Sequence, residues 1–156
     1  MNNLIKLKNI NKSFDSLKKI KVLKKINFKF NYGKIYSIIG PSGSGKSTLL
    51  NLLSLIDRPS SGTIIIEDKI INFKDSNKND FLRANKIGIV YQQDNLLPDF
   101  TALENIYLAS LAAENNKKLS IAKAKILLKK VGLLNRSDHY PSQLSGGEKQ
   151  RVSIAR

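Results

Sequence analysis

Gly40-Pro41-Ser42-Gly43-Ser44-Gly45-Lys46-Ser47-Thr48 is the stretch of sequence that decides the fold of this chain. Its pattern is G-x-x-x-x-G-K-[S/T], which is typical of a loop that wraps a phosphate group. The apolar run 35–39 precedes the loop, and a leucine-rich pattern with helical spacing follows it over 49–56. The sequence therefore predicts a strand at 35–39, a phosphate-binding loop at 40–48 and a helix directly after it.

The residue types in this loop suit the binding of phosphate. Glycines let the backbone adopt unusual angles and approach a ligand closely. Backbone N–H groups at the start of a helix, together with the positive end of the helix dipole, attract anions. Lys46 supplies a positive charge for the outer phosphates, and Ser47 supplies a hydroxyl for Mg²⁺. A merely structural glycine turn is the alternative, but the predicted strand and helix on either side favour phosphate binding.

The composition limits the class of protein. The chain has 156 residues, of which 41% are hydrophobic, and this is enough for one compact domain with a core. It has no cysteine and a single histidine, His139, which excludes disulfides and metal sites built from thiolates or histidines. No apolar run is long enough to span a membrane, and the N-terminus lacks the apolar segment of a signal peptide. We expect a cytoplasmic protein that reaches a membrane only through partners.

The net charge of +15 raises the question of an anionic partner. Most of this charge is lysine, which is spread over every segment among many Asn and Ile residues. A protein that reads nucleic acid usually shows arginine clusters or interleaved aromatic residues, and the sequence shows neither. We interpret the lysines as a solvated surface and expect no nucleic-acid partner.

Short apolar runs with alternating polar residues predict an antiparallel β part near the N-terminus. Ile26, Phe28 and Phe30, for example, alternate with Asn27 and Lys29. The expected strands are 3–10, 20–30, 63–67, 70–73 and 87–91. A short helix is expected around 80–84.

The pattern changes after Tyr91 and predicts a helical subdomain over 92–140. Thr101 and Glu104 have the spacing of a capping box, which predicts a helix to about residue 113. Residues 115–118 are expected to be a linker, and a second helix begins at Ser120 and stops at Gly132. This helix presents one apolar face to a core, formed by Ile121, Ala124, Leu127, Leu128 and Val131. We therefore expect one α/β domain in which 1–91 and 141–156 form the core.

A second glycine-containing loop, Leu144-Ser145-Gly146-Gly147-Glu148, lies close to the C-terminal end of the sequence. The residues after it predict a helix, so its glycines would again lie at a helix start, where N–H groups are free to bind an anion. Ser145 and Glu148 also have the spacing of a capping box. Taken alone, this loop favours plain helix capping over phosphate binding.

The two loops together resemble the nucleotide-binding domain of ABC transporters, and the resemblance covers essentially the whole chain. It implies an α/β fold of the P-loop NTPase type, with ATP and Mg²⁺ as ligands. Phe14 resembles the aromatic residue that stacks on adenine, although core packing would also explain it. Gln92, after the predicted strand 87–91, resembles the glutamine that senses Mg²⁺ and the attacking water, and its neighbour Gln93 is the competing candidate.

The resemblance also implies partners. In this family the LSGGQ signature of one subunit covers the terminal phosphate of ATP held by the P-loop of a second subunit. The implied working unit is a head-to-tail homodimer bound to integral membrane permease subunits. In this chain Ser145, Gly146 and Gly147 match the signature, whereas Glu148 stands where the family has Gln. We expect phosphate contact to survive this difference.

A finer similarity points to one subfamily. The runs 96–105 and 144–156 are similar to those of the ATPase of the lipoprotein-releasing (Lol) complex. This similarity implies a peripheral ATP hydrolase on the cytoplasmic face of the bacterial inner membrane that drives lipoprotein release. The alternatives are an ATPase of a macrolide or peptide efflux system or of a cell-division system, an ABC ATPase that acts on nucleic acid, and a remnant that binds nucleotide without hydrolysing it.

Hydrolysis needs groups that the family supplies after the signature, namely a Walker B aspartate, an adjacent glutamate and a switch histidine. None of these follows the signature in this sequence, and His139 precedes it, so we expect His139 to be a surface residue. We therefore expect a fragment or truncated product in which the C-terminal part of the core is missing. Such a chain alone should bind ATP weakly and should not hydrolyse it.

Overall fold

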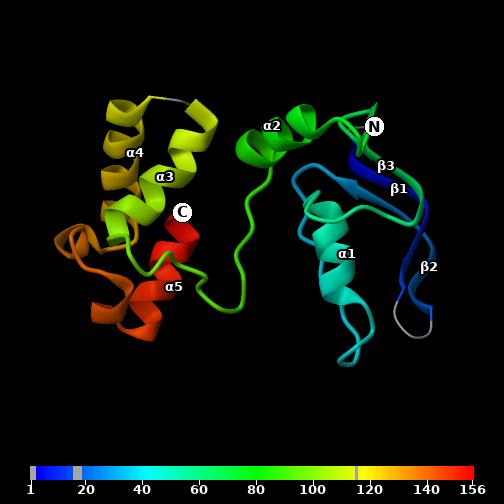
Figure 1. Ribbon diagram of the computed structural model, residues 1–156, viewed down its shortest axis with the longest axis horizontal. Helices are drawn as coiled ribbons and strands as arrows, with labels where there is room; N and C mark the ends of the chain where they lie inside the picture. Colours follow the sequence, from blue (N-terminus) through cyan, green and yellow to red (C-terminus); the bar gives the residue numbers. More distant parts are fainter. Residues whose placement is uncertain (1–2, 16–18, 115) are drawn as a thin grey trace. The chain divides into compact units, whose positions relative to one another are not determined.

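The computed structural model describes residues 3–15, 19–114 and 116–156 (Figure 1). The chain divides into two compact units, Met1–Arg83 and Ala84–Arg156. The first unit contains a sheet with two helices, and the second unit is helical. In the described part of the chain, no helix combines the length and the apolarity that a membrane span requires.

The sheet of the first unit has four antiparallel strands in the order β2-β1-β3-β4. This order confirms the predicted N-terminal antiparallel part, and β1 extends further than predicted, to Phe14. Leu7, Ile10 and Ile64 are buried, and the pairing of β1 with β2 shifts its register between Leu7 and Ile10, which interrupts the alternation of the strand there. The strands are β1 (Asn3–Phe14), β2 (Ile20–Asn31), β3 (Ser61–Ile66) and β4 (Lys69–Ile70).

Two helices follow in the first unit, and the second of them, α2, continues past the end of this unit at Arg83. α1 (Lys46–Leu53) begins within the glycine-rich loop, as predicted, and buries Leu52. α2 (Ser76–Lys86) begins earlier than the predicted 80–84. Its early start is explained by Asp75, whose Oδ1 accepts a hydrogen bond from the N–H of Lys78 at 3.2 Å and so satisfies a free donor of the first turn.

Two predicted strands are absent from the structure. Residues 35–39 and 87–91 have no regular secondary structure, and of the predicted strand at 70–73 only Ile70 lies in a strand, β4. A strand is stabilised by hydrogen bonds to neighbouring strands, and neither 35–39 nor 87–91 pairs with another strand among the described residues. Ile35 and Ile39 consequently have 100% and 92% of their surface exposed, although their sequence is typical of a buried strand.

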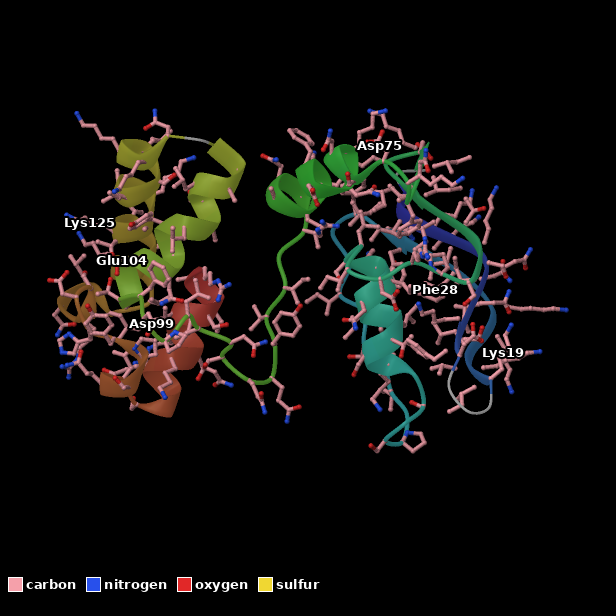
Figure 2. All side chains as sticks on the ribbon, in the orientation of Figure 1. Lys19, Phe28, Asp75, Asp99, Glu104 and Lys125 are labelled. Carbon is pink, nitrogen blue, oxygen red and sulfur yellow. The ribbon has the colours of Figure 1, made fainter. Side chains whose placement is uncertain are left out.

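The second unit is built from α3 (Ala102–Glu114), α4 (Lys117–Lys130) and α5 (Gly146–Ala155), with short 3-10 turns at Leu134–Arg136 and Pro141–Gln143. The capping box predicted for α3 is confirmed. The N–H of Thr101 donates to Oε2 of Glu104 at 2.8 Å, and the N–H of Glu104 donates to Oγ1 of Thr101 at 3.3 Å. Figure 2 labels Glu104 in the first turn of this helix.

The helix α4 begins earlier than predicted because Asn116 caps it. Oδ1 of Asn116 accepts a hydrogen bond from the N–H of Leu119 at 3.0 Å, so the predicted linker 115–118 is too long. The helix ends before Gly132, whose φ of 73° is typical of a residue that terminates a helix.

The core of the second unit confirms four of the five residues of the predicted apolar face of α4, whereas Ile121 is only partly buried and lies outside this core. Ala124 and Leu128 are fully buried, and Leu127 and Val131 pack against them. The other buried members of this core come from α3, α5 and the connecting segments, and they are Leu96, Ala102, Ile106, Leu133, Leu144, Val152 and Ala155.

Candidate functional site

The loop 40–48, which the sequence predicts to bind phosphate, presents backbone donors at the start of α1. Gly43 and Gly45 have φ values of 77° and 92°, which residues with a Cβ rarely adopt. Gly45 is the N-cap of α1, and among the residues that the structure describes no side chain caps this helix. The N–H groups of its first turn therefore remain available, and the helix dipole adds a partial positive charge at the same place. This arrangement suits an anion.

Lys46 lies against the same loop. Its Nζ donates hydrogen bonds to the carbonyl oxygens of Gly40, at 2.9 Å, and Pro41, at 2.7 Å. The ammonium group is thus held beside the free donors of the loop, where it adds a full positive charge. The structure therefore brings together the glycines and the lysine that the sequence pattern predicts as a phosphate site.

The strand β2 supports this loop from one side. A Cβ added at Gly45 would lie 2.9 Å from Cγ1 of Val22 and 3.1 Å from Cδ2 of Leu23. Glycine is therefore required at this position for space as well as for its backbone angle. The backbone at the start of α1 therefore lies close to the side chains of β2.

A metal ion at this loop would depend on few protein ligands. In the described ranges, no group of three or more His, Cys, Asp or Glu side chains is placed to hold a metal ion. The side chain of Ser47 is exposed at the first turn of α1. A single hydroxyl fits Mg²⁺, which is usually bound by one or two protein groups together with substrate phosphates and water.

The second glycine loop is capped, as one of its two interpretations predicts. The N–H of Ser145 donates to Oε2 of Glu148 at 2.8 Å, and the N–H of Glu148 donates to Oγ of Ser145 at 3.3 Å. This capping box starts α5 at Gly146, three residues earlier than predicted. Phosphate binding by Ser145, Gly146 and Gly147 remains a prediction.

Glu148 has a further partner that the sequence does not reveal. Oε1 of Glu148 lies 3.3 Å from Nε of Arg136, and Nη1 of Arg136 lies 3.0 Å from Nε2 of His139. The hydrogen bonds that Glu148 accepts from Ser145, and then the charge of Arg136, lower the pKa of Glu148 below its usual range. The glutamate that replaces the family's Gln is thus held as a carboxylate.

Replacing Glu148 with Gln should flatten the acid dependence of stability. Because the pKa of Glu148 is lowered by folding, its stabilisation is present above the usual pKa range of Glu and is lost as the pH falls through the folded pKa. The wild-type chain should therefore be more stable than Glu148→Gln near neutral pH, and the difference should vanish in acid. Thermal unfolding between about pH 7 and about pH 3 measures this.

Asp99→Asn is the matched control, because it removes one exposed negative charge from the same unit without touching this hydrogen-bond network. A loss of thermal stability that both variants share reflects the change in net charge alone. A constant difference between wild type and Glu148→Gln at every pH would contradict the role of the carboxylate.

Gln92 and Gln93 lie together in the second unit, in an open polar pocket of about 540 Å³ that is also lined by Asp94, Gly146 and Gln150. The pocket brings Gln92 close to the start of α5. It does not show which of the two glutamines approaches a nucleotide, so the role of Gln92 in sensing Mg²⁺ and water remains a prediction.

Phe14 lies at the end of β1, and 43% of its surface is exposed. This exposure disagrees with the alternative that Phe14 is a core residue. Nζ of Lys12 lies 4.8 Å from the centre of its ring. Stacking of Phe14 on adenine remains a prediction.

Asn105 is a structural residue that the sequence patterns do not identify. It is almost fully buried in α3, and its Nδ2 donates to the carbonyl oxygens of Leu97, Phe100 and Thr101. Its Oδ1 accepts from the N–H of Leu97 at 2.8 Å. This one side chain fixes the apolar loop before α3. The sequence signal that could have revealed it is a polar side chain at a position where the helical spacing to Ala102 and Ile106 predicts an apolar one.

Comparisons with known proteins point to the same family as the two glycine loops. The family model described as ABC transporter matches residues 23–156. The lipoprotein-releasing system ATP-binding protein LolD of Saccharophagus degradans is 44% identical over 98% of this chain and 68% of the relative. LolD of Bacteroides thetaiotaomicron is 43% identical over 98% of this chain and 69% of the relative.

Solved structures share the fold. The dimeric structure of MJ0796, a bacterial ABC transporter cassette, has a TM-score of 0.87 and 40% identity, and the match covers 97% of this chain and 67% of that one. The same cassette in a dimeric post-hydrolysis state, bound to ADP and Pi, also has a TM-score of 0.87. The predicted α/β fold of the P-loop NTPase type is confirmed, and the chain belongs to the ABC transporter family.

Proposed function

We propose that this chain is the ATP-binding subunit of an ABC transporter that releases lipoproteins from the bacterial inner membrane. The observation that carries the proposal is the uncapped start of α1, with the ammonium of Lys46 held beside it. The relatives named as ATP-binding proteins of lipoprotein-releasing systems support the choice of substrate. The ADP and Pi bound by the related cassette support ATP hydrolysis as the activity of the complete system.

The roles of the residues at the phosphate loop follow from its chemistry. The first N–H groups of α1 bind the outer phosphate oxygens, and Lys46 donates to the same oxygens in place of the carbonyls of Gly40 and Pro41. Ser47 offers its hydroxyl as a ligand to Mg²⁺, which neutralises part of the phosphate charge when it is bound. Gln92 is proposed to orient the attacking water.

The complete site is proposed to need a second subunit. In a head-to-tail homodimer, Ser145, Gly146 and Gly147 of one subunit would cover the phosphate that the loop 40–48 of the other subunit holds. The related cassette is dimeric, which supports this assembly. We propose that the dimer binds integral permease subunits at the cytoplasmic face of the inner membrane.

Replacing Ser47 with Ala should weaken ATP binding in the presence of Mg²⁺ more than in its absence. The hydroxyl is proposed as a metal ligand, so its loss removes a contact that exists only when the metal is present. Isothermal titration with ATP, with Mg²⁺ or with EDTA, measures both affinities. Ser76→Ala, an exposed serine of the same unit, is the matched control. Equal losses with and without Mg²⁺ would contradict the assigned role.

The choice of transporter is tested by co-purification. The tagged chain, expressed with the permease subunits of the lipoprotein-releasing system or with those of an efflux or cell-division system, should be retained in detergent only by the first set. Retention by an efflux or cell-division permease instead would refute lipoprotein release as the function of the transporter. It would not contradict the proposed phosphate site.

A further inference from the structure

We propose that Lys12 is a positioning residue for Phe14, because its tethered ammonium fixes the aromatic ring on which the purine base of a bound nucleotide stacks. The inference rests on the proposed function. It adds to the predicted stacking of Phe14 the residue that orients its ring.

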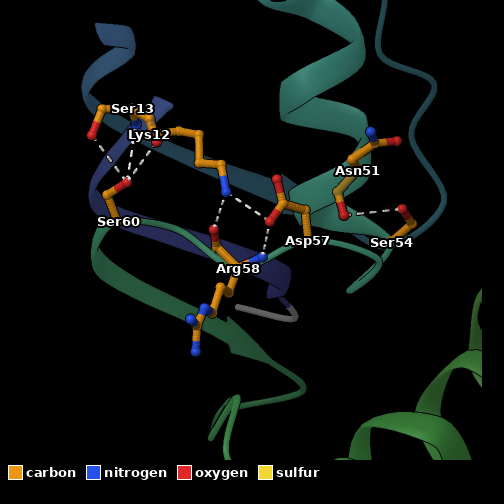
Figure 3. A network of polar contacts seen from close by, with 7 residues as sticks. All are labelled: Lys12, Ser13, Asn51, Ser54, Asp57, Arg58 and Ser60. Carbon is orange, nitrogen blue, oxygen red and sulfur yellow. Dashed lines mark hydrogen bonds and ion pairs between the residues drawn. The ribbon is translucent and has the colours of Figure 1, made fainter. Parts of the chain in front are cut away.

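Lys12 is an unusual lysine for a surface strand. Only 8% of its surface is exposed, and lysine is rarely buried unless its charge is paired. Its Nζ donates to Oδ1 of Asp57 at 2.7 Å and to the carbonyl oxygen of Arg58 at 2.9 Å (Figure 3). Two of its three donors are thus used, and the ammonium has one fixed position.

That position lies over the ring of Phe14. Nζ of Lys12 is 4.8 Å from the ring centre, within the distance at which a cation is attracted to the face of an aromatic ring. Phe14 otherwise has 43% of its surface exposed at the end of its strand. An exposed ring at a strand end would sample several rotamers, so a fixed cation on one face selects among them.

The backbone between the two residues is also fixed. The N–H of Ser13 donates to Oγ of Ser60 at 3.0 Å, and Oγ of Ser60 lies within hydrogen-bond distance of Oγ of Ser13, as Figure 3 shows. Because residues two apart on a strand share a face, Lys12 and Phe14 point to the same side of β1. The ammonium of Lys12 and the ring of Phe14 therefore lie on the same face of β1, next to one another.

This pair belongs to the part of the sheet that supports the phosphate loop. Lys12 pairs with Leu23 across β1 and β2, and Phe14 pairs with Ile20. Leu23 is one of the two residues that lie against Gly45 at the start of α1. Asp57, which holds the ammonium, follows the other end of α1. The ring is thus connected through short contacts to both ends of the helix that holds the phosphates.

A purine base fits this arrangement. Bases stack on aromatic side chains irrespective of sequence, and a ring that is held in one orientation loses less freedom when a base stacks on it. A purely structural ion pair between Lys12 and Asp57 would stabilise the fold, but it would affect every ligand of the phosphate loop equally. The two roles therefore differ in whether the effect depends on the base.

The test compares ATP with inorganic tripolyphosphate, which offers the phosphates without a base, by isothermal titration of the full chain. Lys12→Met keeps the apolar stem and removes the charge, and it should weaken ATP binding about two- to fivefold while leaving tripolyphosphate binding unchanged. Lys12→Arg should restore ATP binding. The matched control is Lys8→Met, which removes an exposed lysine from the same strand.

Phe14→Ala and the double variant Lys12→Met/Phe14→Ala complete a double-mutant cycle with Lys12→Met. The double variant should bind ATP as weakly as Phe14→Ala, because Lys12 acts only through the ring. If Lys12→Met does not fold, Asp57→Ala removes the carboxylate that accepts from the ammonium while keeping the lysine, and it should show the same base-dependent loss.

Three results would overturn the inference: equal losses for both ligands, no loss of ATP binding in Lys12→Met, or no effect of Phe14→Ala. These results all require a wild-type chain that binds tripolyphosphate. A folded wild-type chain that binds neither ligand would instead refute the proposed function itself.

Discussion

Replacing Lys46 with Ala is expected to lower the affinity for ATP by about a hundredfold, because hydrogen bonds to a charged group are among the strongest that a protein makes to a ligand. The ammonium lies beside the uncapped N-terminus of α1 and donates to two carbonyl oxygens of the loop. Its loss removes both the charge that faces the phosphates and the contact that holds the loop around them. Titration with MgATP measures the effect.

The control for this experiment is Lys29→Ala, which removes an exposed lysine from β2 in the same unit. It lowers the net charge equally, so any loss that both variants share reflects long-range attraction. Circular dichroism should show that both variants remain folded. An affinity of Lys46→Ala within twofold of the control would contradict the phosphate site.

Replacing Gly62 with Ala is expected to destabilise the first unit by more than about 3 kcal/mol. Gly62 has a φ of 99°, and an added Cβ would lie 2.4 Å from the carbonyl oxygen of Asn9. The clashing atoms belong to the backbone of β1, which pairs with β3 in the same sheet. They cannot move without breaking that pairing. Thermal and urea unfolding of the variant measures the loss.

Gly33→Ala is the matched control for the steric part of this effect. Gly33 has a φ of 67°, but nothing lies within 4 Å of an added Cβ. Its replacement should cost only the strain of a left-handed backbone, about 1–2 kcal/mol. If Gly62→Ala were no worse than Gly33→Ala, the close approach of β1 and β3 at Asn9 would be wrong.

The elements that depend on local signals could be predicted from the sequence. The helices α1 and α3 have start signals in the glycine loop and in the capping box of Thr101 and Glu104, and both form. The strands 35–39 and 87–91 have an equally clear apolar pattern, yet they do not form. An apolar run can predict only that a segment suits a sheet, because the hydrogen bonds that make it a strand come from neighbours elsewhere in the chain.

The residues of the candidate site likewise fall into those that the sequence identifies and those that only the structure identifies. Gly45 and Lys46 are identified by spacing along the chain, whereas Lys12 and Arg136 are identified only by what they contact in space. Lys12 is one of many lysines in the sequence, and nothing near it marks it as buried. Its partner Asp57 lies beyond the glycine loop, so the ion pair could be found only after the sheet and α1 were placed together.

The two glycine loops begin helices that differ in their N-terminal caps. Ser145 and Glu148 accept and donate the capping hydrogen bonds of α5, whereas no described side chain caps α1. In a helix without a side-chain cap, a bound anion accepts the hydrogen bonds of the free N–H groups in the first turn. The folding equilibrium of the first unit is therefore linked to the concentration of nucleotide, by about 2.7 kcal/mol at a hundred times the dissociation constant. In the isolated chain the loop 145–148 is already capped by its own side chains, so nucleotide binding stabilises the fold through α1 of the first unit.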